Sequence, residues 1–155
     1  MARNDGGPES RDTMPLFVLH HLRPPADVAN RINHSEGTGA AAEAVQRAML
    51  SGDAGAALAL GFYRPVATIR CASLEDLFRR TNHIDADWTE GPGVLDVAHP
   101  CRSTSVGDLA FSLAERAVFI CAIQGWRPLT DKRLADQVIH ASHDFLDRLS
   151  QTQRS

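Results

Sequence analysis

The residues with the most reactive side chains are concentrated in one stretch of the 155-residue chain, between Ser73 and Val106. This stretch contains acids, bases, soft ligands, hydroxyl groups and an arginine, at Asn82, His83, Asp85, Trp88, Glu90, His99, Cys101, Arg102 and the run Ser103-Thr104-Ser105. Histidine beside carboxylates can transfer protons or bind a metal ion, and a hydroxyl group activated by a base can act as a nucleophile. The same side chains can instead hold a loop together through hydrogen bonds to its own backbone.

The first polar group, His83, Asp85 and Glu90, follows the end of a predicted helix. A metal site or an acid–base pair would use the imidazole together with one or both carboxylates. A His-x-Asp pattern has little specificity, whereas loops commonly use such residues for local hydrogen bonds. We therefore interpret the group as a hydrogen-bonded loop and keep catalysis as the alternative.

The hydroxyl residues Ser103 to Ser105 follow an arginine and precede a Gly-Asp pair. If the fold brought His83 and Asp85 close, one of these hydroxyl groups could serve as a nucleophile. The sequence has no Gly-x-Ser-x-Gly nucleophile elbow, and such a run is typical of a turn or bulge at a strand end. We assign no catalytic residue. The alternative that we retain is a small hydrolase or group-transfer enzyme that uses Asn82, His83, Asp85 and the segment Arg102–Ser105.

Other histidines and cysteines are too scattered to predict a metal site. Zinc sites need three or four ligands in a recognisable frame, and neither His99 with Cys101 nor the pair His140 and His143 has visible partners. The adjacent residues His20-His21 point to opposite sides of a predicted strand. We expect no metal and no cofactor, since the sequence also lacks a phosphate-binding Gly-rich loop and a dinucleotide fingerprint.

Trp88 lies among the acidic residues Asp85, Asp87 and Glu90. A tryptophan in such a segment can pack over the end of a sheet with its N–H at the rim, or it can anchor a partner protein. The carboxylates can form a solvated face, or a surface complementary to a basic groove. For Trp88 itself we favour packing over a partner contact. If the chain binds a protein partner, we predict that Asp85, Asp87, Trp88 and Glu90 form the contact.

The composition is that of an ordinary globular chain, with 43% apolar and 23% charged residues. A formal net charge of −3 argues against general binding to a phosphate backbone, so we do not expect direct nucleic-acid binding. Three cysteines without a C-x-x-C spacing predict reduced thiols. No apolar run has the length of a membrane span, and the N-terminus has no secretory signal, so we expect a cytoplasmic protein that does not bind membranes.

The hydrophobic pattern predicts an α+β domain with a small, mainly antiparallel sheet and helices packed on one face. We expect strands over residues 16–22, 63–71, 109–113 and 118–123, and helices over 40–50 and 54–60, from Ser73 to about Asn82, and from an N-cap at Thr130 onward. The predicted boundaries are a disordered tail over residues 1–13, a single domain over 14–150 and a frayed tail over 151–155. A homodimer formed through a sheet edge or the last helix is a further hypothesis.

Three segments resemble a group of small bacterial proteins encoded on plasmids, prophages and integrative elements. The segments are Leu74–Glu90 (LEDLFRRTNHIDADWTE), Arg102–Phe111 (RSTSVGDLAF) and Val118–Leu129 (VFICAIQGWRPL). The last two are also similar to the Ser-x-Ser-Val-x-Asp and strand pattern of YodL-like domains. The resemblance covers about Tyr63 to Leu129, so the first sixty residues and the last helix have no part in it.

The resemblance implies an accessory protein of a mobile genetic element. Such proteins often act against host defence, as inhibitors of CRISPR surveillance complexes or of restriction enzymes. The group supplies no catalytic residues that could be carried over. We therefore expect a non-enzymatic, anti-CRISPR-like inhibitor whose partner is a host protein or nucleoprotein complex.

Overall fold

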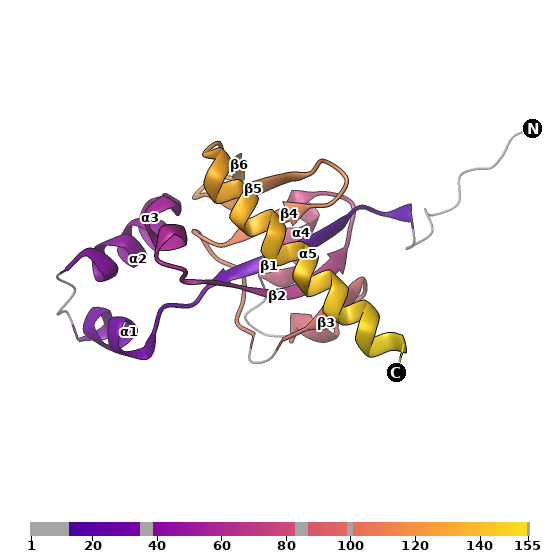
Figure 1. Ribbon diagram of the computed structural model, residues 1–155, viewed down its shortest axis with the longest axis horizontal. Helices are drawn as coiled ribbons and strands as arrows, with labels where there is room; N and C mark the ends of the chain where they lie inside the picture. The colour runs from indigo at the N-terminus through magenta and orange to yellow at the C-terminus, as the bar shows by residue number, and fades with distance from the viewer. Residues whose placement is uncertain (1–12, 35–38, 83–86, 99–100, 155) are drawn as a thin grey trace, which may run out of the picture.

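The computed structural model describes residues 13–34, 39–82, 87–98 and 101–154 of the chain (Figure 1). Its six strands form one sheet in the order β3-β2-β1-β4-β5-β6, and neighbouring strands are antiparallel. The strands are β1 Leu16–Leu22, β2 Tyr63–Arg70, β3 Val94–Val97, β4 Leu109–Ser112, β5 Ala117–Cys121 and β6 Trp126–Pro128. The helices are α1 Ala26–Asn33, α2 Ala40–Ser51, α3 Gly55–Ala59, α4 Leu74–Thr81, the 3₁₀ turn η2 Trp88–Glu90, and α5 Lys132–Arg154. The predicted α+β class and antiparallel sheet are confirmed.

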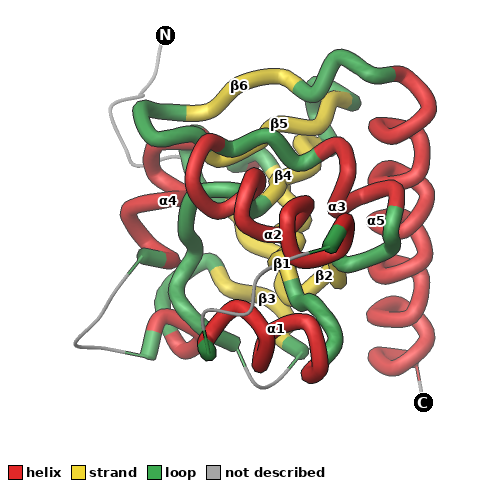
Figure 2. Tube along the Cα trace, turned by 90° about the vertical axis from the view of Figure 1, so that its left-hand side faces the viewer, coloured by secondary structure: helices red, strands yellow, loops and turns green. Residues whose placement is uncertain are grey.

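Strand β1 lies inside the sheet, and its alternating side chains divide the hydrophobic core into two parts. Val18 and Leu22 pack with residues of α5, whereas Phe17 and Leu19 pack with residues of α4. Helix α5 crosses one face of the sheet in Figure 1, and the view in Figure 2 places α4 and α5 on opposite sides of it. The helices are therefore divided between the two faces and not packed on one face as expected, because β1 presents apolar side chains on both. Helices α1, α2 and α3 gather at one end of the sheet.

Helix α4 begins as the sequence predicts. The Ser73 hydroxyl accepts a hydrogen bond from the backbone N–H of Asp76 at 3.1 Å, which is a standard N-cap contact. The Asp76 carboxylate in turn binds the side chains of Arg79 and Arg80 in the last turn of the helix. These contacts fix the direction in which α4 leads to Asn82, where the polar network described below begins.

The hydrophobic pattern does not predict the three short elements α1, β3 and β6. Helix α1 has eight residues, of which only Val28 is buried, and β3 and β6 have four and three residues.

Helix α5 also differs from the prediction at both ends. Its N-terminal capping residue is Asp131 and not Thr130, because Asp131 Oδ1 accepts from the backbone N–H of Leu134 at 3.1 Å, and the helix continues past Ser150 to Arg154.

Candidate functional site

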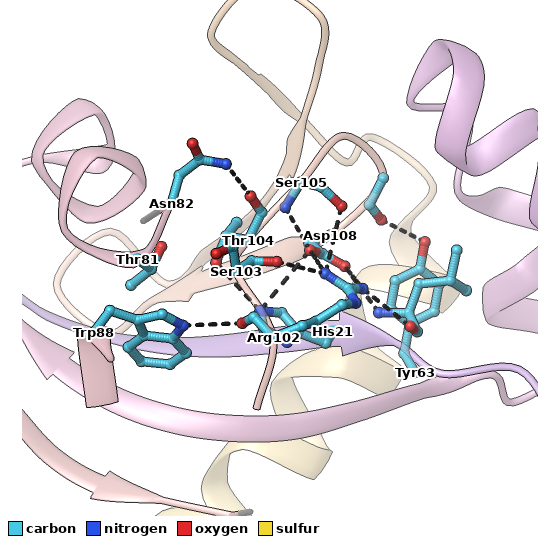
Figure 3. A network of polar contacts seen from close by, with 12 residues as sticks. His21, Tyr63, Thr81, Asn82, Trp88, Arg102, Ser103, Thr104, Ser105 and Asp108 are labelled. Carbon is cyan, nitrogen blue, oxygen red and sulfur yellow. Dashed lines mark hydrogen bonds and ion pairs between the residues drawn. The ribbon is translucent and has the colours of Figure 1, made fainter. Parts of the chain in front are cut away.

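The carboxylate of Asp108 is the centre of a polar network between the end of β1 and the segment that precedes β4 (Figure 3). Asp108 is fully buried. Its Oδ1 accepts from the backbone N–H of Leu22 at 2.9 Å and from Arg102 Nη2 at 2.7 Å. Its Oδ2 accepts from Arg102 Nη1 at 2.7 Å and from the backbone N–H of Ser105 at 2.8 Å. These four hydrogen bonds compensate the loss of hydration and fasten residues 102–108 to β1.

Arg102 closes the network on the solvent side. Its guanidinium also donates to the carbonyl oxygens of Leu22 at 3.0 Å and Ser103 at 2.8 Å, and it lies 3.4 Å from the Ser105 hydroxyl. Burial lowers the pKa of Arg102, but the hydrogen bonds and charge of Asp108 raise it by more, so the group stays protonated. The two parallel contacts to one carboxylate are specific to the planar arginine fork, which a lysine could not reproduce.

Thr104 is also used to hold the backbone. Its N–H donates to the carbonyl of Thr81 at 3.0 Å, and its own carbonyl accepts from Asn82 Nδ2 at 2.6 Å. Its hydroxyl lies 3.2 Å from His21 Nε2. Thr104 therefore joins the end of α4 to β1, in agreement with the interpretation of the hydroxyl run as a structural turn.

Trp88 is a packing residue beneath this network. Its side chain is 4% exposed, and its Nε1 donates to the carbonyl of Arg102 at 2.9 Å. The indole meets the His21 ring edge-on, with 6.3 Å between the ring centroids. The ring is thus part of the core, while Asp87 and Glu90 on either side of it are exposed. The Asp87 carboxylate caps η2 by accepting from the backbone N–H of Thr89 at 3.0 Å.

Gly107 joins the same segment to strands β2 and β5 and lies close to helix α2. The Tyr63 hydroxyl donates to the Gly107 carbonyl at 2.5 Å, and the Gly107 N–H donates to the carbonyl of Cys121 at 2.8 Å. Gly107 has φ of 95°, and a Cβ atom at this position would lie 2.6 Å from the carbonyl oxygen of Ala48. Only glycine satisfies both the positive φ and the close approach of α2.

His20 and His21 serve opposite faces of the sheet. The Ser142 hydroxyl donates to the carbonyl of Val138 at 2.8 Å, so it accepts from His20 Nε2 at 2.7 Å. Burial lowers the pKa of His20 to about 3 and that of His21 to about 4. Both imidazoles are therefore neutral near pH 7, and His21, 3.9 Å from the Asp108 carboxylate, forms no ion pair with it.

A cavity of about 340 Å³ beside the network is lined by His21, Arg23, Cys101 and Arg102. Burial raises the pKa of the Cys101 thiol to about 11, and the nearby Arg23 and Arg102 only partly oppose this effect. The thiol is therefore protonated at neutral pH, whereas the thiolate is the form that attacks a substrate or binds a metal. This cavity does not contain an activated cysteine.

Part of the predicted site lies outside the described residues, namely His83, Asp85 and His99. On α5, His140 is exposed and lies 3.5 Å from Asp144, and His143 packs edge-on against Phe111. Among the residues that the structure describes, no group of three His, Cys, Asp or Glu side chains could hold a metal ion. Within the same residues, no helix is both long and apolar enough to cross a membrane.

Sequence reasoning identified Arg102 and the hydroxyl run but missed their main partner. Asp108 follows Arg102 by six residues, across a turn that contains glycine. The opposite charges on either side of this turn could have predicted the Arg102–Asp108 ion pair. The contributions of His21 and Tyr63 had no such signal, because they come from strands that are distant in the sequence.

Comparison with known proteins adds no relative to this description. No family model, no curated protein and no solved structure matches the chain.

Proposed function

We propose that this chain is a non-enzymatic protein-binding protein whose contact surface includes the acidic residues around η2. The observation that supports this best is that the polar groups of residues 102–108 form hydrogen bonds with the backbone of the chain itself. Arg102, Thr104 and Asp108 are all committed to hydrogen bonds that hold the backbone of the chain itself. A segment whose polar groups are used in this way supplies rigidity for binding, not groups for catalysis.

Among the described residues, the Thr104–His21 pair and the Cys101 thiol are unsuited to nucleophilic catalysis. Such catalysis needs a hydroxyl or thiol that contacts a base and that a substrate can reach. Thr104 and His21 form a hydroxyl–imidazole pair, but both side chains are buried, and the Cys101 thiol is protonated. These observations favour binding over the hydrolase or transferase alternative.

The exposed carboxylates of Asp87 and Glu90 are held on a rigid support. The buried Trp88 anchors η2 from below through its hydrogen bond to the Arg102 carbonyl. A surface that is already ordered loses less conformational entropy when a partner binds. Opposite charge on the partner would raise the association rate and set the orientation of the complex. Asp85, two residues before Asp87, belongs to the same predicted surface.

The resemblance to mobile-element proteins indicates the class of partner. CRISPR effector complexes hold nucleic acid in a positively charged channel. A small protein with net charge −3 and an ordered acidic turn is suited to occupy such a channel. We therefore propose an anti-CRISPR-like inhibitor that acts in the cytoplasm on a host defence protein or nucleoprotein complex.

The test is capture of the partner from extracts of a bacterial host by the tagged protein, at several salt concentrations. The variant Asp87→Asn/Glu90→Gln removes both charges and keeps the polar shape of the side chains. The matched control Asp136→Asn/Asp144→Asn makes the same charge change on the exposed face of α5. We expect the first variant to weaken capture at low salt and to flatten its salt dependence, while the control behaves as wild type. Equal capture by both variants would contradict the role of the acidic turn.

A further inference from the structure

We propose that the pocket between α1 and α2 binds a small amphipathic carboxylate, with an apolar body against the helices and its carboxylate toward Arg102. The pocket is a cavity of about 450 Å³, which is within the usual range for small-molecule sites. This inference goes beyond the proposed protein binding and does not depend on it, because the pocket and the acidic turn share no residue.

The walls of the pocket are mainly apolar. They include Ala29 and Ile32 of α1, Val45 and Met49 of α2, and Val106. Met49 is 52% exposed, so an apolar ligand would cover a side chain that otherwise meets water. Methionine is flexible and polarisable, and it can adapt to ligands of different outline.

The pocket also has polar lining residues, namely Arg102, Ser105 and Asn33. The Arg102 side chain is 44% exposed, whereas its counter-ion Asp108 is 0% exposed and lies behind it. Arg102 lines the pocket, whereas Asp108 does not. The Nη groups of Arg102 already donate to Asp108, Leu22 and Ser103, so a ligand carboxylate would accept from the Ser105 hydroxyl and lie close to the positive charge of the guanidinium.

Helix α1 is the wall that a ligand would stabilise most. It has eight residues with one buried side chain, and its N-cap residue Pro25 provides no side-chain hydrogen bond. Helices of this length are marginal without tertiary contacts. A ligand that contacts both helices would add such contacts, so the amides of α1 should exchange more slowly with solvent when it binds.

Sodium octanoate and 1-octanol are suitable probes, because they share an eight-carbon chain and differ in charge. Each would be titrated into the full-length protein while ¹H–¹⁵N NMR spectra are recorded. We expect saturable shifts at Ala29, Ile32 and Met49, and about tenfold tighter binding of octanoate than of octanol, as one charge-assisted interaction would give. Hydrogen exchange of residues 26–33 should slow in the presence of octanoate.

Two variants separate pocket binding from general adhesion to apolar surface. Ala29→Phe fills the pocket and should weaken octanoate binding at least about tenfold, as loss of most contacts would give. Ala40→Phe adds the same ring at an exposed position of α2 and should leave binding unchanged. The wild-type titration is decisive even if Ala29→Phe fails to fold. Equal affinity for the two probes, shifts confined to other surfaces, or no saturable binding would overturn the proposal.

Discussion

Replacing Asp108 by asparagine tests the network most severely while keeping the size of the side chain. The carboxylate accepts four hydrogen bonds, and all four partners are donors. The amide nitrogen of asparagine cannot accept, so either orientation leaves one main-chain N–H and one contact of Arg102 unsatisfied. A buried donor that loses its partner costs about 1–3 kcal/mol. Because Arg102 is partly exposed and can recover some hydration, we expect a loss of about 3 kcal/mol in the free energy of unfolding.

Urea unfolding followed by circular dichroism would measure this loss, provided that the m value stays unchanged. Asp53→Asn is the matched control, because Asp53 is 58% exposed and lies 4.0 Å from Arg47. An exposed pair of this kind contributes at most about 1 kcal/mol. The reasoning is refuted if Asp108→Asn destabilises the protein no more than Asp53→Asn does.

Two further predictions concern stability. The pKa values of His20 and His21 fall from 6.5 to about 3 and about 4 on folding, so the folded state binds fewer protons and is destabilised as pH falls below 6.5. Between pH 6.5 and 5 each histidine should lower the free energy of unfolding by about 2 kcal/mol, which urea unfolding at several pH values would detect. A free energy of unfolding that does not change with pH in this window would contradict the prediction. Gly107→Ala should lower stability by several kcal/mol more than Gly61→Ala, as measured by thermal unfolding. Both glycines have positive φ, but only at Gly107 would the new Cβ lie against Ala48. Equal losses of stability would show that the contact with α2 is unimportant.

The long elements could be predicted because their apolar pattern repeats often enough to be read. Strand β1, helix α2 and helix α5 lie where the sequence predicts, with errors confined to their ends. Helix α1 and strands β3 and β6 could not be predicted, since each has too few buried residues to show the regular apolar spacing of a helix or strand. The sequence also does not reveal that β1 is covered on both faces, because this depends on which strands pair with it.

The site was predictable only where its contacts are local. The turn after Arg102 follows from its residue types, and Ser73 was correctly predicted as a helix cap. The burial of Trp88 agrees with the packing that its sequence context favoured, although an indole among acidic residues also suits an exposed anchor. Its core neighbours include Phe17 and Leu19 of β1, which are distant in the sequence.

The central claim is that the polar segment Arg102–Asp108 before β4 supports a binding surface and takes no part in catalysis. The most direct measurement compares Ser105→Ala with Asp87→Asn/Glu90→Gln in quantitative partner capture from host extract. The Ser105 hydroxyl is exposed and lies 3.4 Å from Arg102 Nη1, while the backbone of Ser105 makes the contacts to Asp108. We predict that Ser105→Ala captures a stoichiometric partner as wild type does and that the charge-neutralised variant does not. Loss of capture in a folded Ser105→Ala protein, with full capture by the other variant, would contradict the claim.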